Sequence, residues 1–191
     1  MKRFSFIIIT GLFFASCNNK TSDEATSNDK KEEKMDSSNT ASITYPYKAD
    51  FSSDFKIGDP NHSKLVLDFY KAWEENRMDD MKPMLTDSVW VDFSDGSKFR
   101  GTADSLIKTG KEFRAMYSKV SSTLDAWIPV HSNDKNADYV LVWGRDHNTN
   151  KSGKVDSLGG HSYWEIKNNK IAGWGEYSQK LVAPPMPPKK K

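Results

Sequence analysis

The carboxyl group of Asp92 is the first candidate for acid–base chemistry in this sequence. Residues 89–93 alternate like a β-strand, so Trp90 and Asp92 share one face and the apolar neighbours share the other. A carboxyl group in an apolar pocket has a raised pKa, which suits it to remove a proton next to a carbonyl group. Alternatively, Asp92 accepts backbone hydrogen bonds at the end of its strand, because the turn-forming residues Ser94-Asp95-Gly96 follow it.

A second set of polar candidates lies on the strand-like residues 138–147. Trp143, Arg145 and His147 alternate there, so they share one face of the strand. Arg145 beside Trp143 can bind a carboxylate or stack on an aromatic ligand. The same residues also suit a solvated outer face, and the alternation does not decide which face points inward.

The third set lies on residues 158–166. The more apolar face carries four residues: Leu158, Ser162, Trp164 and Ile166. We expect Trp164 in the core or in a pocket wall, and His161, on the opposite face, exposed or at an interface. Trp90, Trp143, Arg145, Ser162 and Trp164 are therefore the candidate pocket residues. Core packing explains most of the six tryptophans equally well.

The sequence predicts neither a metal site nor a cofactor. The four histidines, His62, His131, His147 and His161, lack a short ligand spacing such as HxxxH. Glycine-rich nucleotide-binding patterns and a Gly-x-Ser-x-Gly elbow are also missing from the sequence.

The expected elements place these candidates in one α+β domain. Leu65, Phe69, Ala72 and Trp73 recur at three- and four-residue steps, which predicts a helix from His62, capped by Asn61 or Ser63. We expect two more helices, a short one at 79–85 and another after Thr102. Strands are expected at 89–93, 120–130, 138–147, 158–166 and 171–177, with the last two forming a hairpin.

Composition divides the rest of the chain. Only Ala25, Met35 and Ala41 are apolar between residues 18 and 42, so this segment cannot bury enough surface to fold. We expect a disordered tether over residues 17–52, a domain over 53–182 and a frayed proline- and lysine-rich tail over 183–191.

Cys17, the single cysteine, ends an apolar stretch at the N-terminus. Lys2 and Arg3 precede the almost wholly apolar residues 4–14, and Ala15-Ser16-Cys17 follows, as in an export signal. The segment is shorter than the roughly 20 residues of a transmembrane helix. It resembles the lipobox of bacterial lipoproteins, which implies removal of residues 1–16 and acylation of Cys17. Asn18 in the following position favours the outer over the inner membrane in that family.

Removal of residues 1–16 also changes the charge of the chain. Loss of Lys2 and Arg3 reduces the 28 basic residues to 26, which equals the number of acidic ones. A neutral protein offers no electrostatic reason to expect nucleic acid as a partner. With Cys17 acylated, no thiol is left for a disulfide or a nucleophile. We expect an envelope protein that is attached to the membrane through its acyl chains.

Several stretches of the domain resemble the nuclear transport factor 2-like, or SnoaL-like, superfamily. They are Leu65-Val-Leu-Asp-Phe-Tyr-Lys-Ala-Trp73, Asp79-Asp80-Met81, Leu85-Thr-Asp-Ser-Val-Trp-Val-Asp92, Phe99-Arg-Gly101, His161-Ser-Tyr-Trp-Glu-Ile166 and Asn169-Lys170-Ile171. The resemblance implies a conical, strongly curved antiparallel sheet around about three N-terminal helices, with a pocket at its open end. This superfamily contains isomerases, cyclases, epoxide hydrolases, dehydratases and binding proteins, so the fold does not choose among them.

The resemblance also suggests roles for individual residues. In the steroid-isomerase members, the position of the general base corresponds to Asp92. A tyrosine on the first helix, here Tyr70 or its neighbour Phe69, helps to stabilise the oxyanion. Ser162 stands where the second acidic group of those enzymes is expected, so their complete set is absent here.

Three functional interpretations remain. The first is a binding protein whose conical pocket holds a small, partly apolar molecule. The second is a small isomerase, cyclase or lyase that uses Asp92 as its base, with Tyr70 or Arg145 as a second donor. The third is an interaction domain that forms a homodimer through an aromatic sheet face containing Tyr163, Trp174 and Tyr177.

Overall fold

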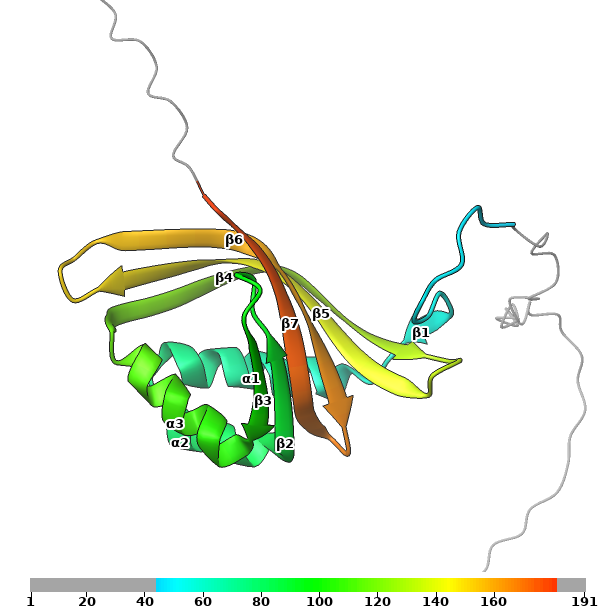
Figure 1. Cartoon of the computed structure of the whole chain (residues 1–191), viewed down its shortest axis with the longest axis horizontal. Coiled ribbons are helices and arrows are strands. Elements are labelled where there is room, and N and C mark those ends of the chain that lie inside the picture. Colours follow the sequence, from blue (N-terminus) through cyan, green and yellow to red (C-terminus); the bar gives the residue numbers. More distant parts are fainter. Residues whose placement is uncertain (1–43, 182–191) are drawn as a thin grey trace, which may run out of the picture. The chain divides into compact units, whose positions relative to one another are not determined.

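A seven-stranded sheet curves around the helices of the domain (Figure 1). The computed structural model describes residues 44–181 of the chain. These residues form, in chain order, β1 (Phe55–Ile57), α1 (Pro60–Glu74), α2 (Met78–Met81), η1 (Lys82–Met84), β2 (Leu85–Asp92), β3 (Lys98–Thr102), α3 (Ala103–Arg114), β4 (Tyr117–Ser132), β5 (Ala137–Asn150), β6 (Val155–Lys167) and β7 (Lys170–Lys180). Neighbouring strands follow the order β1-β4-β5-β6-β7-β2-β3. The α+β class predicted from the sequence is confirmed.

The sheet is mixed rather than purely antiparallel. β2 runs parallel to β7, whereas the other neighbouring strands are antiparallel. Two strands that were not expected from the sequence, β1 and β3, form the two edges of the sheet. β1 contains only three residues and β3 only five, so neither shows a clear apolar alternation.

The start of α1 differs from the prediction for a physical reason. The side chain of Asp59, not that of Asn61 or Ser63, caps the helix by accepting a hydrogen bond from the Asn61 backbone N–H at 2.8 Å. Pro60 occupies the first turn, where its missing N–H costs little. The predicted cap of α3 is confirmed, because the Thr102 side chain accepts a hydrogen bond from the Ser105 backbone N–H.

The hydrophobic core lies between the helices and the sheet face that they cover, here called the concave face. α1 buries Val66, Phe69 and Ala72 against this face. The strands contribute Val89, Val91, Val140, Val142, Trp164, Ile166, Ile171 and Trp174. Because side chains alternate along a strand, the residues between these point to the opposite side, here called the outer face.

Two glycines of β7 let large rings lie flat on the outer face. A Cβ atom on Gly173 would lie 2.4 Å from Cδ2 of Trp90, and one on Gly175 would lie 2.4 Å from Cε1 of Tyr163. The indole of Trp90 therefore covers the neighbouring strand instead of standing upright in solvent. Glycine is required at these positions because of the close approach of the rings, not because of an unusual backbone conformation.

The predicted signal peptide (1–16), Cys17, most of the tether and the tail (183–191) lie outside the described residues. The compact unit begins at Tyr47, six residues before the boundary at 53 that composition predicts. Within residues 44–181, no helix combines the length and apolar character needed to cross a membrane.

Candidate functional site

Tyr70 and Ser162 meet on the concave face, although 92 residues separate them in the sequence. The oxygen atoms of their hydroxyl groups lie 3.1 Å apart. Nε1 of Trp164 donates a hydrogen bond of 2.7 Å to the same Ser162 oxygen. The two hydroxyls use one proton for the bond between them, so the second proton remains free for another acceptor. The structure thus brings together three of the predicted site residues.

The protonation state of Tyr70 suits a hydrogen-bond donor. Burial raises the pKa of its phenol to about 12, and the nearby carboxyl groups of Asp146 and Glu176 act in the same direction. The ring of Tyr70 lies against Trp164, with 5.4 Å between the ring centroids. Tyr70 is therefore a neutral phenol with an apolar wall beside it.

Asp146 brings the first carboxyl group to this site. It alternates on β5 with the core residue Val142, so its side chain points to the concave face. The Ser122 hydroxyl donates a hydrogen bond of 2.6 Å to Oδ1 of Asp146. Burial raises the pKa of Asp146, and the negative charge of Glu74 raises it further.

Glu176 brings a second carboxyl group from β7. It lies directly across from Ser162 in the pairing of β6 with β7, and it shares the concave face with Trp174. Nε1 of Trp174 donates a hydrogen bond of 2.8 Å to Oε1 of Glu176. Burial raises the pKa of Glu176, and the charge of Asp146 adds to this effect. The two carboxyl groups are therefore close enough to influence each other.

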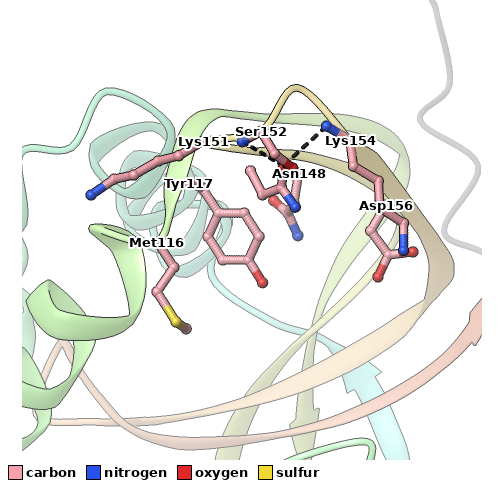
Figure 2. A pocket seen from close by; sticks show the side chains of 8 residues that line it. Met116, Tyr117, Asn148, Lys151, Ser152, Lys154 and Asp156 are labelled. Carbon is pink, nitrogen blue, oxygen red and sulfur yellow. Dashed lines mark hydrogen bonds between the residues drawn. The ribbon is translucent and has the colours of Figure 1, made fainter.

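A pocket of about 480 Å³ lies at the end of the β5–β6 hairpin, and its lining residues do not include Tyr70, Asp146 or Glu176. Figure 2 shows Met116 and Tyr117, which follow α3, together with Asn148 and Asp156 of the hairpin. The remaining lining residues are Asn150, Lys151, Ser152 and Lys154. Asn148 lies two residues after Asp146 and pairs with Asp156, so both belong to the concave face. The pocket and the carboxyl groups thus lie on the same side of the sheet.

Asp92 does not lie on the concave face. Its neighbour Val91 is fully buried in the core, so the strand alternation turns Asp92 to the outer face. There its Oδ1 accepts a hydrogen bond of 2.7 Å from Nη2 of Arg100. The alternative role also differs from the prediction, because Asp95, not Asp92, accepts the backbone N–H of Ser97 in the turn.

Trp90, Trp143 and Arg145 also lie on the outer face, not in a pocket wall. Nε1 of Trp90 donates to Glu165, and Nη2 of Arg145 donates to Asp125. Trp143 is 40% exposed. Trp90 and Trp143 end a row of rings on the outer face whose neighbouring centroids lie 5.2–6.3 Å apart: Trp143, His161, Tyr177, Tyr163 and Trp90. Trp174, which the sequence analysis placed in such a face, lies in the core instead.

Sequence reasoning missed Asp146 and Glu176, although a signal for both was present. Asp146 is in phase with the apolar Val140 and Val142, and Glu176 is in phase with Trp174. A carboxylate that continues the apolar face of a strand is a candidate for a buried acid. The polar candidates predicted from this strand, Arg145 and His147, lie on its other face.

Among residues 44–181, no group of three or more histidine, cysteine, aspartate or glutamate side chains could hold a metal ion. The concave face presents the hydroxyl groups of Tyr70 and Ser162 and the carboxyl groups of Asp146 and Glu176 beside aromatic rings.

The raised pKa values predict how stability depends on pH. The folded protein holds the protons of Asp146 and Glu176 more tightly than the unfolded chain does, so their contribution to stability falls as the pH rises from about 4. Glu176→Gln replaces one of these carboxyl groups with an amide that does not titrate. The melting temperature of this variant should therefore fall less between about pH 4 and pH 7 than that of the wild type. Glu112→Gln, an exposed change on α3, is the control and should follow the wild-type profile. Parallel profiles for the wild type and Glu176→Gln would contradict the assignment.

No model of a protein family matches this sequence, and no curated protein matches it. Among solved structures, an LEH-like epoxide hydrolase from M. tuberculosis matches at 15% identity and a TM-score of 0.53, over 63% of this chain and 84% of that one. An NTF2-like protein of unknown function from Burkholderia pseudomallei K96243 matches at 17% identity and a TM-score of 0.51, over 62% and 91% of the two chains. A candidate SnoaL-like polyketide cyclase from Jannaschia sp. CCS1 matches at 10% identity and a TM-score of 0.50, over 63% and 86%. At these identities the likeness shows the fold alone: the chain has the nuclear transport factor 2-like fold that its motifs predicted.

Proposed function

We propose that this chain is a lipid-anchored protein of the bacterial cell envelope, held at the outer rather than the inner membrane. We also propose that its concave face binds a small, partly apolar molecule. The observation that carries the binding role is the contact between the Tyr70 and Ser162 hydroxyl groups, which leaves one of their two protons for a further acceptor. A donor held in place beside buried aromatic rings is typical of a site that orients one polar group of a largely apolar ligand.

The surroundings of this donor support the same ligand class. Trp164 and Trp174 stack with 4.7 Å between their centroids and form the buried apolar surroundings of the donor. Burial raises the pKa values of Asp146 and Glu176 and so favours their protonated form, which can donate a hydrogen bond, more than water does. A ligand with a carbonyl or hydroxyl group on an apolar skeleton fits these groups.

Ligand binding is expected to raise the melting temperature of the protein, because a ligand that binds only the folded state stabilises it by mass action. A panel of small metabolites tested by thermal shift identifies the ligand. Tyr70→Phe should then weaken its affinity about tenfold, the typical effect of one hydrogen bond. Tyr177→Phe, at a 61% exposed tyrosine of the outer face, is the matched control and should bind like the wild type. Equal affinities for all three proteins would contradict a role for the Tyr70–Ser162 pair.

An isomerase, cyclase or lyase activity is the alternative function. The effect of the Asp146 charge on the pKa of Glu176 favours it, since two carboxyl groups with shifted pKa values can act as acid and base. The Arg100 contact of Asp92 on the outer face gives that residue no part in such chemistry.

If a bound compound is converted, Asp146→Asn should lower kcat/KM by about 10²–10⁴-fold, the usual contribution of a general acid or base. Asp92→Asn is the control variant and should keep the wild-type rate. Product formation followed by chromatography distinguishes the two variants. A loss of rate in Asp92→Asn but not in Asp146→Asn would overturn this assignment.

A further inference from the structure

Four large apolar side chains are exposed on or just before the first edge strand. Tyr47 is 88% exposed, Phe51 49%, Phe55 45% and Ile57 70%. We call these four residues the β1 patch. Phe55 and Ile57 are two residues apart on a strand, so they share one face. Ile57 pairs with Val130, which pairs with the outer-face residue Tyr139. Phe51 also contacts Tyr139, with 5.8 Å between the ring centroids, so the patch belongs to the outer face.

The backbone that carries most of this patch is held in place. β1 pairs with residues 130–132 of β4. The backbone N–H of Asn133 donates to the carbonyl oxygen of Asp54, and the Asn133 amide donates to the Asp54 carboxylate at 2.8 Å. Ser52 donates a further hydrogen bond to Asp134. The apolar side chains thus project from an ordered edge. Exposed apolar groups on an ordered support are typical of a surface that meets a partner.

The β1 patch has no net charge that would attract a charged partner. Between residues 47 and 57 the two lysines, Lys48 and Lys56, balance the two aspartates, Asp50 and Asp54. Nζ of Lys135 lies 5.7 Å from the ring centroid of Phe51. Aromatic rings beside lysine side chains suit a lipid–water boundary, because the rings and methylene groups enter the apolar layer while the ammonium groups stay in water.

The position of the patch in the chain favours a lipid surface as its partner. From Asn18 to Thr44 there are 27 residues. A random coil of 27 residues would have a root-mean-square end-to-end distance of about 30 Å. An anchor at Cys17 would therefore keep the β1 patch close to the bilayer. The patch would then meet lipid at a high effective concentration, so that even a weak affinity for lipid would be enough for docking.

We propose that the β1 patch docks on the surface of the membrane that holds the acylated N-terminus. This inference rests on the proposed lipid anchor but not on the proposed ligand. The neutral charge of residues 47–57 predicts that docking depends on apolar burial and changes little between about 0.1 and 0.5 M salt.

A spin label tests this inference in the full acylated chain reconstituted in phospholipid vesicles. Cys17 is the only cysteine and its thiol is acylated, so Ile57→Cys gives a single site for labelling. The matched control is Val155→Cys. Val155 is 55% exposed and lies at the turn of the β5–β6 hairpin, far along the sheet from β1. We expect the label at residue 57, but not that at residue 155, to be protected from a water-soluble relaxation agent. Adding Phe55→Ser should reduce this protection.

Each outcome decides the question. A chain that is retained on vesicles but shows equal accessibility at the two labels contradicts docking while leaving the anchor intact. A chain that is not retained contradicts the anchor and this inference together. Protection at residue 57 that needs high protein concentration rather than vesicles would identify a second copy of the chain as the partner and overturn the lipid assignment. Whether or not the thermal-shift panel identifies a ligand for the concave face does not affect the result of this experiment.

Discussion

Trp164→Ala is expected to lower the free energy of unfolding by about 3–5 kcal/mol, the largest effect on stability that we predict for one side chain. Trp164 is 4% exposed, and its ring stacks on Trp174 and meets the edge of Phe69 from α1. The substitution leaves a cavity between helix and sheet and removes the donor to Ser162. Chemical denaturation followed by circular dichroism measures the loss.

Trp143→Ala is the matched control, because it removes the same side chain from the outer face. Trp143 is exposed and stacks on His161, so its loss should cost less than about 1.5 kcal/mol. Similar losses for the two variants would contradict the division between the core and the outer face. If Trp164→Ala does not fold, Trp164→Phe keeps the apolar contact and tests the hydrogen bond to Ser162 separately.

Cys17→Ser is expected to abolish lipid attachment, because no other thiol is available for the diacylglyceryl group. The wild-type protein extracted from membranes should begin at residue 17 and carry the mass of the acyl chains. The variant should retain residues 1–16 and lack that mass. Mass spectrometry of the N-terminal peptide measures both properties.

Two results bear on the interpretation of this experiment. A chain that starts at Tyr47 should remain in solution and fold, because the compact unit begins at that residue. A free thiol at Cys17 in the wild-type protein, or a mature N-terminus elsewhere, would contradict the lipoprotein assignment. Changing Ser16 to Ala keeps a small residue before the cysteine, so this control should still be acylated.

Two half-buried acids on the concave face, Asp146 and Glu176, change which residues deserve mutagenesis in this domain. Asp146 and Glu176 come from different strands, and the core packing of Val142 and Trp174 positions them. Burial raises both pKa values, the charge of Glu74 raises that of Asp146 further, and the charge of Asp146 raises that of Glu176. Neither a binding role nor a catalytic role at the concave face depends on Asp92, so experiments on that residue serve as controls.

The sequence by itself determined which residues share a strand face. Steric alternation along an extended chain grouped Trp90 with Asp92, and Ser162 with Trp164, and the structure confirms both groupings. Helix periodicity likewise predicted that Phe69 and Ala72 face the core. These properties are local, because they depend only on the backbone geometry of a few successive residues.

Only the tertiary structure decided which of these faces points toward the helices. The parallel pairing of β2 with β7 brings Val91 beside Trp174 and so places Asp92 on the outer face with Arg100. The bond between Tyr70 and Ser162 joins residues that 92 positions separate. The burial that raises the pKa values of Asp146 and Glu176 depends on the same long-range packing. Such contacts lower the free energy only when the whole core forms, so no short stretch of sequence contains them.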